Sequence, residues 1–369
     1  MKNISISQPI ISDEEIAAVV ATMKSGTIVQ WPEVKRLEES FAKLCGTKYA
    51  VAFNSGTAAL HAGLYWFWVK DGDEVITTPF TFVASANPIL MQQAKVVFVD
   101  ISEEDFLIDI NKVEEKISPR TKAIIPVSLY GQVYDYKKLK SITIWKDIKI
   151  LEDACQSVWA SQNGIMSGKC GHAWAFSLYA TKNIMCGEGG ILVTDDEEIA
   201  DRARMLRHHG QSEKTRYQYF DIGYNYRLPD ILAAIGNVQF SKLPDFTERR
   251  QHVASLYLKE LKDIKGLILP KINTGNTHVF HQFVIRITPD FPLSREELIA
   301  KLKEEGIGTN IYYPKPLHLH PHFEKMGYKL WDFPVAEKMA LEVLALPVHP
   351  SVTEEEAHFI IETLKKYGK

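Results

Sequence analysis

The stretch FSLYATKNIMCGEGG, residues 176–190, places one lysine, Lys182, between two apolar runs. The first run ends at Ser177, and after a polar segment and a glycine-rich turn the second begins as ILVT. A lysine held between two buried strands is partly desolvated, which lowers the pKa of its amine and makes it a nucleophile toward a carbonyl. This chemistry points to a Schiff base with an aldehyde cofactor, most commonly pyridoxal phosphate (PLP). The alternative is an ordinary loop lysine, because single lysines near glycines are frequent.

The composition fits one large domain with a smaller one attached. The chain has 369 residues, of which 46% are hydrophobic and 24% charged. The formal net charge is -3, with no sizeable charged block, so we expect neither nucleic acid nor an anionic membrane surface as a partner. The N-terminal segment has no signature of a secretory signal, and no apolar run reaches transmembrane length. The four scattered cysteines are therefore expected to be reduced thiols of a cytoplasmic protein.

Short hydrophobic runs alternate with helical segments over the first half of the chain, for example EVITT, KVVFVD, TKAIIPVSLYG and KILEDA. This alternation predicts an α/β fold with a mostly parallel sheet and helices on both faces. Ligands of such sheets lie at the carboxyl ends of the strands. The strand ends at residues 78–82, 152–153 and 177–182 are therefore expected to meet at the binding site.

Residues 54–57, NSGT, form a small polar turn between the apolar run YAVAF and the helical segment AALHAGLYW. A turn of this kind presents free backbone N–H groups and the positive end of a helix dipole, which suits a phosphate. A simple N-cap by Ser55 or Thr57 would explain the same residues, and the pattern leaves both interpretations open.

Polar and aromatic side chains at the other strand ends suit an aromatic cofactor ring. Asp153 could hydrogen-bond a pyridine nitrogen and keep it protonated, or it could be a helix N-cap. Gln156 could reach a ring hydroxyl. Phe82 could stack on a ring, although core packing is the more common role of such a residue when it is taken alone.

The C-terminal third predicts a separate α+β unit. A helical pattern covers residues 228–261 with a break at Pro244, and residues 266–276 are expected to be a linker. Strands are expected at 278–287 and 309–313, and helices at 294–308 and 353–368. We therefore expect a large domain over residues 1–245 and a small domain over 246–369.

The sequence HLHPH contains alternating histidines at 318, 320 and 322. Histidines on one face of a strand can bind zinc, but Pro316 and Pro321 disfavour a regular strand and no carboxylate or cysteine partner is evident. We expect a loop that contacts the substrate, or plain exposure, and no metal.

Five motifs in order, NSGTAAL, TPFTFVAS, ILEDACQS, FSLYATKN with CGEGG, and GYNYRLPD, resemble those of the DegT/DnrJ/StrS family of sugar aminotransferases. The resemblance extends from ISQPIIS to YPKPLHLHP, nearly the whole chain. It implies PLP as cofactor, the aspartate-aminotransferase fold (fold type I) and a homodimer. The implied reaction transfers an amino group, usually from L-glutamate, to a nucleotide-linked keto-sugar in amino-sugar or polysaccharide biosynthesis.

The resemblance also implies roles for individual residues. Lys182 would form the Schiff base and transfer the proton, and Asp153 would pair with the pyridinium nitrogen. The remaining assignments are Gln156 on the ring hydroxyl, Phe82 in the stacking position (some members have tryptophan there), Gly56, Thr57 and Ser177 on the phosphate, Asn225 on the phosphate of the neighbouring subunit, and Tyr313, His318 and His320 in a segment that lines the substrate site.

Three other activities remain open at this stage. A sugar dehydratase of the same family would have histidine in place of Lys182, which this chain retains. A related enzyme that makes an aromatic amino acid by dehydration is not excluded by the sequence. A PLP-binding regulator without catalysis lacks support, because the sequence has no helix-turn-helix extension or basic segment.

Overall fold

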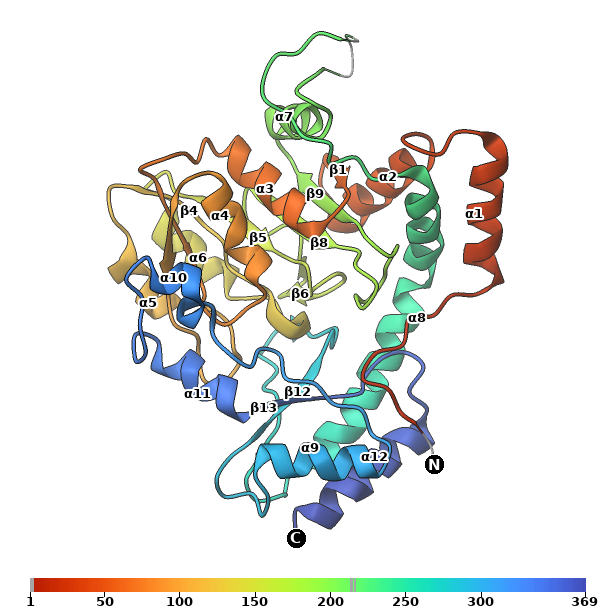
Figure 1. Cartoon of the computed structure of the whole chain (residues 1–369), viewed down its shortest axis with the longest axis vertical. Helices are drawn as coiled ribbons and strands as arrows, with labels where there is room; N and C mark the ends of the chain where they lie inside the picture. Colours follow the sequence, from red (N-terminus) through yellow and green to blue (C-terminus); the bar gives the residue numbers. More distant parts are fainter. Residues whose placement is uncertain (1–2, 213–214, 216) are drawn as a thin grey trace.

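A mostly parallel sheet forms the centre of the computed structural model, which describes residues 3–212, 215 and 217–369. Within that part of the chain it has seven strands in the order β1-β9-β8-β5-β4-β2-β3 (Figure 1). Their bounds are β1 (Tyr49–Phe53), β2 (Glu74–Thr77), β3 (Lys95–Phe98), β4 (Thr121–Ile124), β5 (Lys149–Asp153), β8 (Ala173–Ser177) and β9 (Gly190–Thr194). β9 is antiparallel to β1 and β8, whereas the pairings among β3, β2, β4, β5 and β8 are parallel. The predicted fold class is confirmed.

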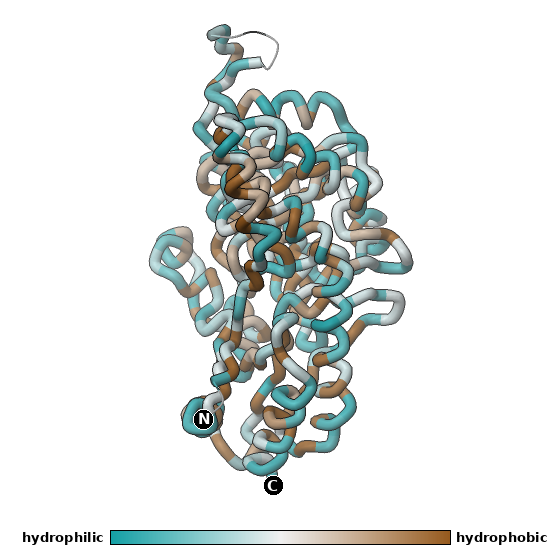
Figure 2. Tube along the Cα trace, turned by 90° about the vertical axis from the view of Figure 1, so that its right-hand side faces the viewer, coloured by the Kyte–Doolittle hydropathy of each residue, from teal (hydrophilic) through white to brown (hydrophobic). Residues whose placement is uncertain are grey.

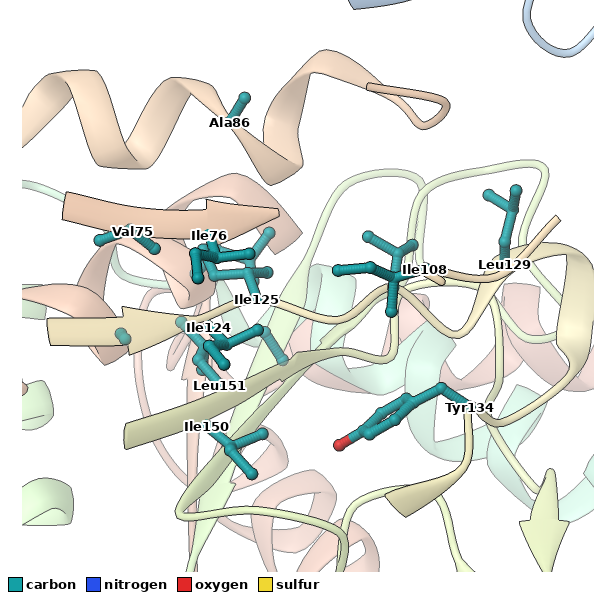
Figure 3. Packing of buried hydrophobic residues seen from close by; sticks show 14 of the residues in the cluster. Val75, Ile76, Ala86, Ile108, Ile124, Ile125, Leu129, Tyr134, Ile150 and Leu151 are labelled. Carbon is teal, nitrogen blue, oxygen red and sulfur yellow. The ribbon is translucent and has the colours of Figure 1, made fainter. Parts of the chain in front are cut away.

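The central strands are buried on both faces, which explains why they are nearly continuous apolar runs in the sequence. Ile76 pairs with Ile124, which in turn pairs with Ile150 on the next strand. Figure 3 shows these side chains packed together with Val75 and Leu151 between the strands and the surrounding helices. A rigid core therefore fixes the strand ends that form the site.

Helices cover both faces of the sheet. α3 (Gly56–Trp66) packs on β5, β8 and β9, whereas α2 (Glu33–Cys45) packs on β1 and β9 from the other side. Figure 2 shows hydrophobic segments mainly inside the molecule and hydrophilic ones along its outer helices. The other helices of this unit are α1 (Asp13–Ser25), α4 (Asn87–Met91), α5 (Ile110–Lys116), α6 (Tyr136–Thr143) and α7 (Glu197–Arg207), with short 3-10 helices η1 (Val83–Ser85) and η2 (Leu129–Gly131).

The long helix α8 (Asp230–Glu260) joins the two units (Figure 1). The predicted break at Pro244 is wrong, because the helix continues through it. Leu243 and Phe246 are buried on either side of the proline, and this packing offsets the missing backbone hydrogen bond. The expected domain boundary between residues 245 and 246 thus falls inside α8.

The C-terminal unit has its own small sheet and core, which also includes Ile4 from the N-terminus. The predicted strand at residues 309–313 is wrong, since only Asn310 forms an isolated bridge, to Ala345. The elements are β10 (Leu267–Ile268), β12 (Phe283–Ile287), β13 (Val343–Leu346), α9 (Arg295–Glu304), η3 (Leu317–Leu319), α10 (Pro321–Glu324), α11 (Pro334–Glu342) and α12 (Glu354–Tyr367). A further small sheet of β6 (Ser161–Gln162), β7 (Ile165–Met166) and β11 (Asn276–Thr277) links the two units, and β11 begins at the last residue of the expected linker.

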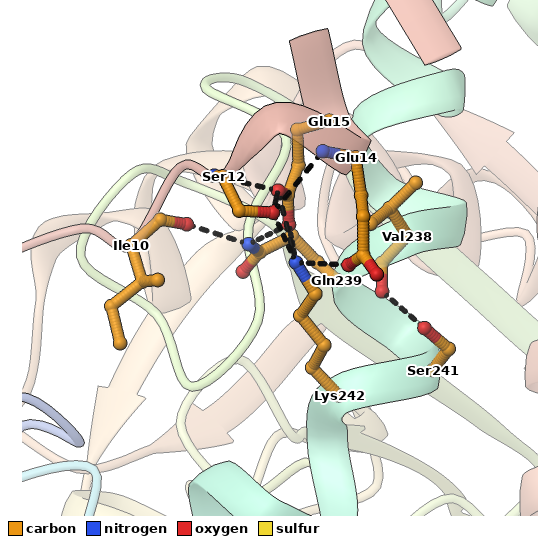
Figure 4. A network of polar contacts seen from close by, with 8 residues as sticks. All are labelled: Ile10, Ser12, Glu14, Glu15, Val238, Gln239, Ser241 and Lys242. Atoms are coloured by element: carbon orange, nitrogen blue, oxygen red, sulfur yellow. Dashed lines mark hydrogen bonds and ion pairs between the residues drawn. The ribbon is translucent and has the colours of Figure 1, made fainter. Parts of the chain in front are cut away.

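Helix α1 begins with the capping box of Ser12 and Glu15, which is fixed onto α8 (Figure 4). The Glu15 carboxylate accepts hydrogen bonds from Gln239 at 2.7 Å and from Lys242 at 2.9 Å. Gln239 also donates to the Ile10 carbonyl at 2.8 Å. These bonds hold the segment that precedes α1 close to α8. No helix among the described residues is long and apolar enough to cross a lipid bilayer.

Candidate active site

The predicted strand ends meet at one edge of the sheet, because the strands they follow run in the same direction. β5 ends at Asp153 and β8 at Ser177, while the turn after β1 begins helix α3. The backbone around Asp153 is tied to its neighbours by the hydrogen bonds Asp153 N to Pro126 O at 2.9 Å and Ser128 N to Asp153 O at 3.0 Å. Polar side chains that follow these strands in the sequence therefore gather at the carboxyl edge of the sheet, where backbone hydrogen bonds hold them.

The first turn of α3 forms a cradle with Gly56 at its base. A methyl group on Gly56 would lie 3.0 Å from Cys155 Sγ and 3.0 Å from Ser177 Cβ, so these three residues are in direct contact. The glycine at position 190 is needed for the same reason, since a Cβ there would lie 2.3 Å from the Ser55 carbonyl oxygen. Two glycines therefore allow the turn, β8 and β9 to approach closely.

The N-terminus of α3 shows the N-cap interpretation of the NSGT turn and leaves room for the phosphate interpretation. Ser55 is the N-cap, and its Oγ accepts the N–H of Ala58 at 3.1 Å. A helix begins with four N–H groups that lack intrahelical partners, so the cap leaves those of Gly56 and Thr57 suited to an anion. Thr57 is half-buried in this first turn, beside Gly56 in the cradle.

The carboxylate of Asp153 is buried and fixed in orientation. Its Oδ2 accepts a hydrogen bond of 2.6 Å from Ser85 Oγ, and its Oδ1 accepts one of 3.1 Å from the N–H of Cys155. Ser85 is itself paired with Thr81 at 3.0 Å. Ser85 was not predicted as a site residue, although it ends the motif TPFTFVAS, whose small polar residues follow a strand end.

Lys182 lies in the turn after β8 and is half-buried. Burial lowers the pKa of its amine, while the nearby Cys155 and Asp153 act in the opposite direction. Its neighbour Asn183 fixes this turn to the C-terminal unit, donating to the Val279 carbonyl at 3.0 Å. Lys182 therefore has the desolvated setting expected for it, and Asp153 lies close enough to raise the pKa of its amine.

Gln156, Tyr313 and Phe82 form a second group at the same edge. Gln156 Oε1 accepts the Tyr130 N–H at 3.0 Å, and its Nε2 donates to the Tyr313 hydroxyl at 3.1 Å. One Nε2 hydrogen remains for a further acceptor. The ring of Phe82 is 57% exposed, with its centroid 6.5 Å from that of Tyr313. Phe82 is thus not a core residue, and a face of its ring is available for stacking.

The two histidines expected near the substrate differ in their surroundings. His318 is fully buried, and its Nε2 lies 3.0 Å from Glu337 Oε1, a carboxylate that also accepts the Trp331 N–H at 2.8 Å. A side chain enclosed in this way does not face an open site, so the burial of His318 gives no support to the substrate contact expected for it. His320 is half-buried and lies with His322, at 6.4 Å between ring centroids.

Asn225 is exposed on the irregular segment that precedes α8. Its carbonyl accepts a hydrogen bond of 3.3 Å from Asn54 Nδ2, and the Asn54 N–H donates to the Tyr226 carbonyl at 2.8 Å. The segment therefore lies beside the NSGT turn of its own chain, with the Asn225 side chain at the surface.

These groups fit pyridoxal phosphate. The Gly56 cradle at the start of α3 suits a phosphate, and Asp153 suits a protonated ring nitrogen. The exposed face of Phe82 suits an aromatic ring, and Lys182 supplies an amine of lowered pKa. The donor set thus matches each part of the cofactor.

The chain is similar to known proteins in sequence and in structure. The chain matches the DegT/DnrJ/EryC1/StrS aminotransferase family over residues 9–365. It is 39% identical to the spore coat polysaccharide biosynthesis protein SpsC of Bacillus subtilis, with 98% of this chain and 96% of that protein covered. It is 32% identical to the GDP-perosamine synthase of Caulobacter vibrioides, covering 99% and 98%.

A solved structure has the same fold. The putative sugar aminotransferase Spr1654 from Streptococcus pneumoniae, in its PLP form, superposes with a TM-score of 0.94 at 30% identity, covering 100% of this chain and 99% of that one. The chain therefore belongs to the DegT/DnrJ/EryC1/StrS aminotransferase family, and its fold is that of the PLP-dependent transferases of fold type I.

Proposed function

We propose that the chain transfers an amino group from L-glutamate to a nucleotide-linked keto-sugar, using PLP, in amino-sugar or polysaccharide biosynthesis. The observation that supports this most is the pair of Lys182 and Asp153, a desolvated amine beside a buried, oriented carboxylate at the carboxyl edge of the sheet. The substrate class rests on the relatives, one named for polysaccharide biosynthesis and one for a GDP-linked product.

Lys182 is proposed as the group that binds the cofactor and moves the proton. An amine whose pKa is lowered by burial loses its proton more readily than an exposed lysine does, and in the neutral form Nζ is both a nucleophile and a base. Bound PLP supplies an electron sink for the carbon that loses its proton. Nζ would accept that proton from the donor side and return it on the acceptor side.

The other residues are proposed to bind and orient. Asp153, held by Ser85, would keep a proton on the ring nitrogen, and Phe82 would cover one face of the ring. The Gln156 amide would use its remaining hydrogen for the ring hydroxyl. The residues proposed for the phosphate are Gly56, Thr57 and Ser177, and those proposed for the sugar substrate are Tyr313 and His320.

We further propose a homodimer in which Asn225 of one chain reaches the cofactor phosphate of the other. The exposed Asn225 side chain and its position beside the NSGT turn support a role at a phosphate. A two-fold interface at this surface would bring two equivalent turns together. The proposed setting is the cytoplasm, where the four free cysteines of the described chain would stay reduced.

A screen with nucleotide-linked keto-sugars tests this function. Purified, PLP-loaded protein is incubated with L-glutamate and each sugar, and 2-oxoglutarate is measured. Sugar-dependent formation of 2-oxoglutarate that is lost in Lys182→Ala supports the proposal. A broad set of keto-sugar nucleotides that gives no 2-oxoglutarate above the Lys182→Ala background would refute it.

A further inference from the structure

Tyr130 lies in the connection after β4, buried and with its backbone in the left-handed region. It is 4% exposed, and its φ is 57°. A residue with a Cβ rarely adopts this conformation, and where one does, the surrounding structure holds it there, often at a functional site. The next residue, Gly131, packs directly on the segment that leads into β12, because a Cβ there would lie 2.9 Å from the backbone nitrogens of Phe280 and His281.

The hydrogen-bonding groups of Tyr130 all have partners, and these bonds join the two units of the chain. Its N–H donates to Gln156 Oε1 at 3.0 Å. Its carbonyl accepts the N–H of Gln282 at 3.2 Å, and its hydroxyl donates to the carbonyl of Tyr312. Burial raises the pKa of Tyr130 well above its ordinary value, so the hydroxyl keeps the hydrogen that it donates. Tyr130 therefore contacts one residue proposed for the cofactor and the neighbour of one proposed for the substrate.

The N–H of Tyr130 decides which end of the Gln156 amide faces the site. A backbone N–H can only donate, so the atom that it takes from the amide is the oxygen. The Nε2 group then points the other way, where it donates to the Tyr313 hydroxyl at 3.1 Å and has one hydrogen left. Gln156 thus turns its donor end, and not its acceptor end, toward Tyr313 and the site.

The Tyr313 hydroxyl is set as a donor by the same series of bonds. Its oxygen accepts from Gln156 Nε2, and burial raises its pKa above the ordinary range, so its own hydrogen stays in place to be donated. Aromatic contacts support the ring of Tyr313, with centroid distances of 6.1 Å to Phe80, 6.2 Å from Phe80 to Phe106 and 5.5 Å from Phe106 to Tyr130. Because the Tyr130 hydroxyl also holds the carbonyl that precedes Tyr313, the position of this donor depends on Tyr130.

We infer that Tyr130 is a positioning residue, whose N–H turns the donor end of Gln156 toward the cofactor and whose hydroxyl holds Tyr313 as a donor to an oxygen of the sugar acceptor. The inference rests on the proposed function, in which Gln156 serves the ring hydroxyl and Tyr313 the sugar. The two contacts come from different parts of Tyr130, the backbone and the side chain. Removal of the side-chain hydroxyl should therefore weaken the reaction with the sugar and leave cofactor binding intact.

A pair of matched variants tests the hydroxyl. Tyr130→Phe removes it but keeps the ring on Phe106 and the N–H for Gln156. Tyr134→Phe is the control, because Tyr134, labelled in Figure 3, is also buried and its hydroxyl donates to the carbonyl of Cys170 at 2.5 Å. Both variants should lower the urea midpoint of unfolding. If Tyr130→Phe does not fold, Tyr313→Phe still tests the donor to the sugar, with the same expected loss.

Kinetics separate the reaction with the sugar from that with the amino donor. For a keto-sugar that is turned over, kcat/KM of the sugar should fall at least fivefold in Tyr130→Phe and less than that in Tyr134→Phe. The half-reaction of Tyr130→Phe with L-glutamate alone should keep a rate within threefold of the parent. Because Tyr130 acts through Tyr313, adding Tyr130→Phe to Tyr313→Phe should cost less than it does in the parent. A smaller loss with the sugar, an equal loss with glutamate, or full additivity would overturn the inference.

Titration of the apoprotein with PLP provides a readout that needs no turnover. Gln156→Glu keeps an acceptor for the Tyr130 N–H but replaces Nε2 with a carboxylate oxygen, whereas Gln156→Leu removes the donor without adding charge. PLP should bind most tightly to the parent and to Tyr130→Phe, more weakly to Gln156→Leu and most weakly to Gln156→Glu.

Two results of this titration would overturn the assignment of Gln156 as a donor. One is parent affinity in Gln156→Leu, and the other is tighter binding of PLP by Gln156→Glu than by Gln156→Leu, which would show that an acceptor faces the ring oxygen. Failure of every keto-sugar in turnover would refute the proposed acceptor, while the PLP titration would still decide the orientation of Gln156.

Discussion

Removing the hydroxyl of Ser85 tests whether the orientation of Asp153 matters for catalysis. Ser85 is fully buried, and its Oγ donates to Asp153 Oδ2 at 2.6 Å. Ser85→Ala removes this bond and leaves the carboxylate the Cys155 N–H at 3.1 Å as a backbone donor. The ionised form of Asp153, which is the form that would hold a proton on the cofactor ring, is then less stable.

The expected loss of rate in Ser85→Ala follows from the energy of the hydrogen bond that is removed. A hydrogen bond to a charged group contributes about 1.5–3 kcal/mol. If this energy is felt fully in the transition state, the half-reaction with L-glutamate should slow roughly 10- to 150-fold. The rate of the cofactor absorbance change after rapid mixing measures this effect, and cofactor affinity should fall much less than the rate.

Ser128→Ala is a closely matched control. Ser128 is also fully buried, and its Oγ donates at 2.6 Å to Glu152, the residue that precedes Asp153 in β5 and whose side chain points to the opposite face of the sheet. Both variants should lower the free energy of unfolding, but only Ser85→Ala should slow the half-reaction. Equal slowing by both variants, or a rate in Ser85→Ala within threefold of the parent, would refute the reasoning.

Three more predictions use the same structure. Gly56→Ala should weaken PLP binding at least tenfold in a cofactor titration, because the added methyl lies 3.0 Å from Ser177 Cβ; unchanged affinity would exclude the cradle as the phosphate site. Burial alone would raise the pKa of Glu15, but its hydrogen bonds, chiefly from Ser12 and Lys242, lower that pKa to about 2. The Glu15 carboxylate therefore stabilises the fold above pH 4.5, and this stability is lost as the pH falls toward 2. Urea unfolding of Glu15→Gln should therefore show a loss of up to about 3 kcal/mol at pH 7 that disappears near pH 2, and an equal loss at both pH values would contradict the linkage. A doubly tagged dimer with Lys182→Ala in one chain and Asn225→Ala in the other should have about half of the parent activity, since one of two equivalent sites keeps both residues. Activity no higher than that of either mutant homodimer would show that Asn225 does not act across the interface.

Elements whose signals are local could be predicted from the sequence. The strand, polar turn and helix around Gly56 follow directly from one another along the chain, and the structure contains them as β1 (Tyr49–Phe53) and α3 (Gly56–Trp66). The helix start at Ser294 is likewise confirmed, because its capping box lies within four consecutive residues. Short-range patterns of this kind fix an element before its tertiary partners are known.

Features that depend on distant partners could not be predicted. The bond from Ser85 to Asp153 joins residues 68 positions apart, and that from Gln156 to Tyr313 joins residues 157 apart. The burial of His318 against Glu337 follows from the packing of α11 and is invisible in the motif HLHPH. At Pro244 the local preference for a break is overridden by the buried side chains around it.

The attachment point of the cofactor tests the central claim most directly. Purified, PLP-loaded protein is reduced with borohydride and digested, and the mass of the reduced cofactor is located by peptide mapping. The account predicts that the cofactor is found on the peptide that contains Lys182, and that Lys182→Ala yields no such adduct. A reduced adduct on any other lysine of the parent protein would contradict it.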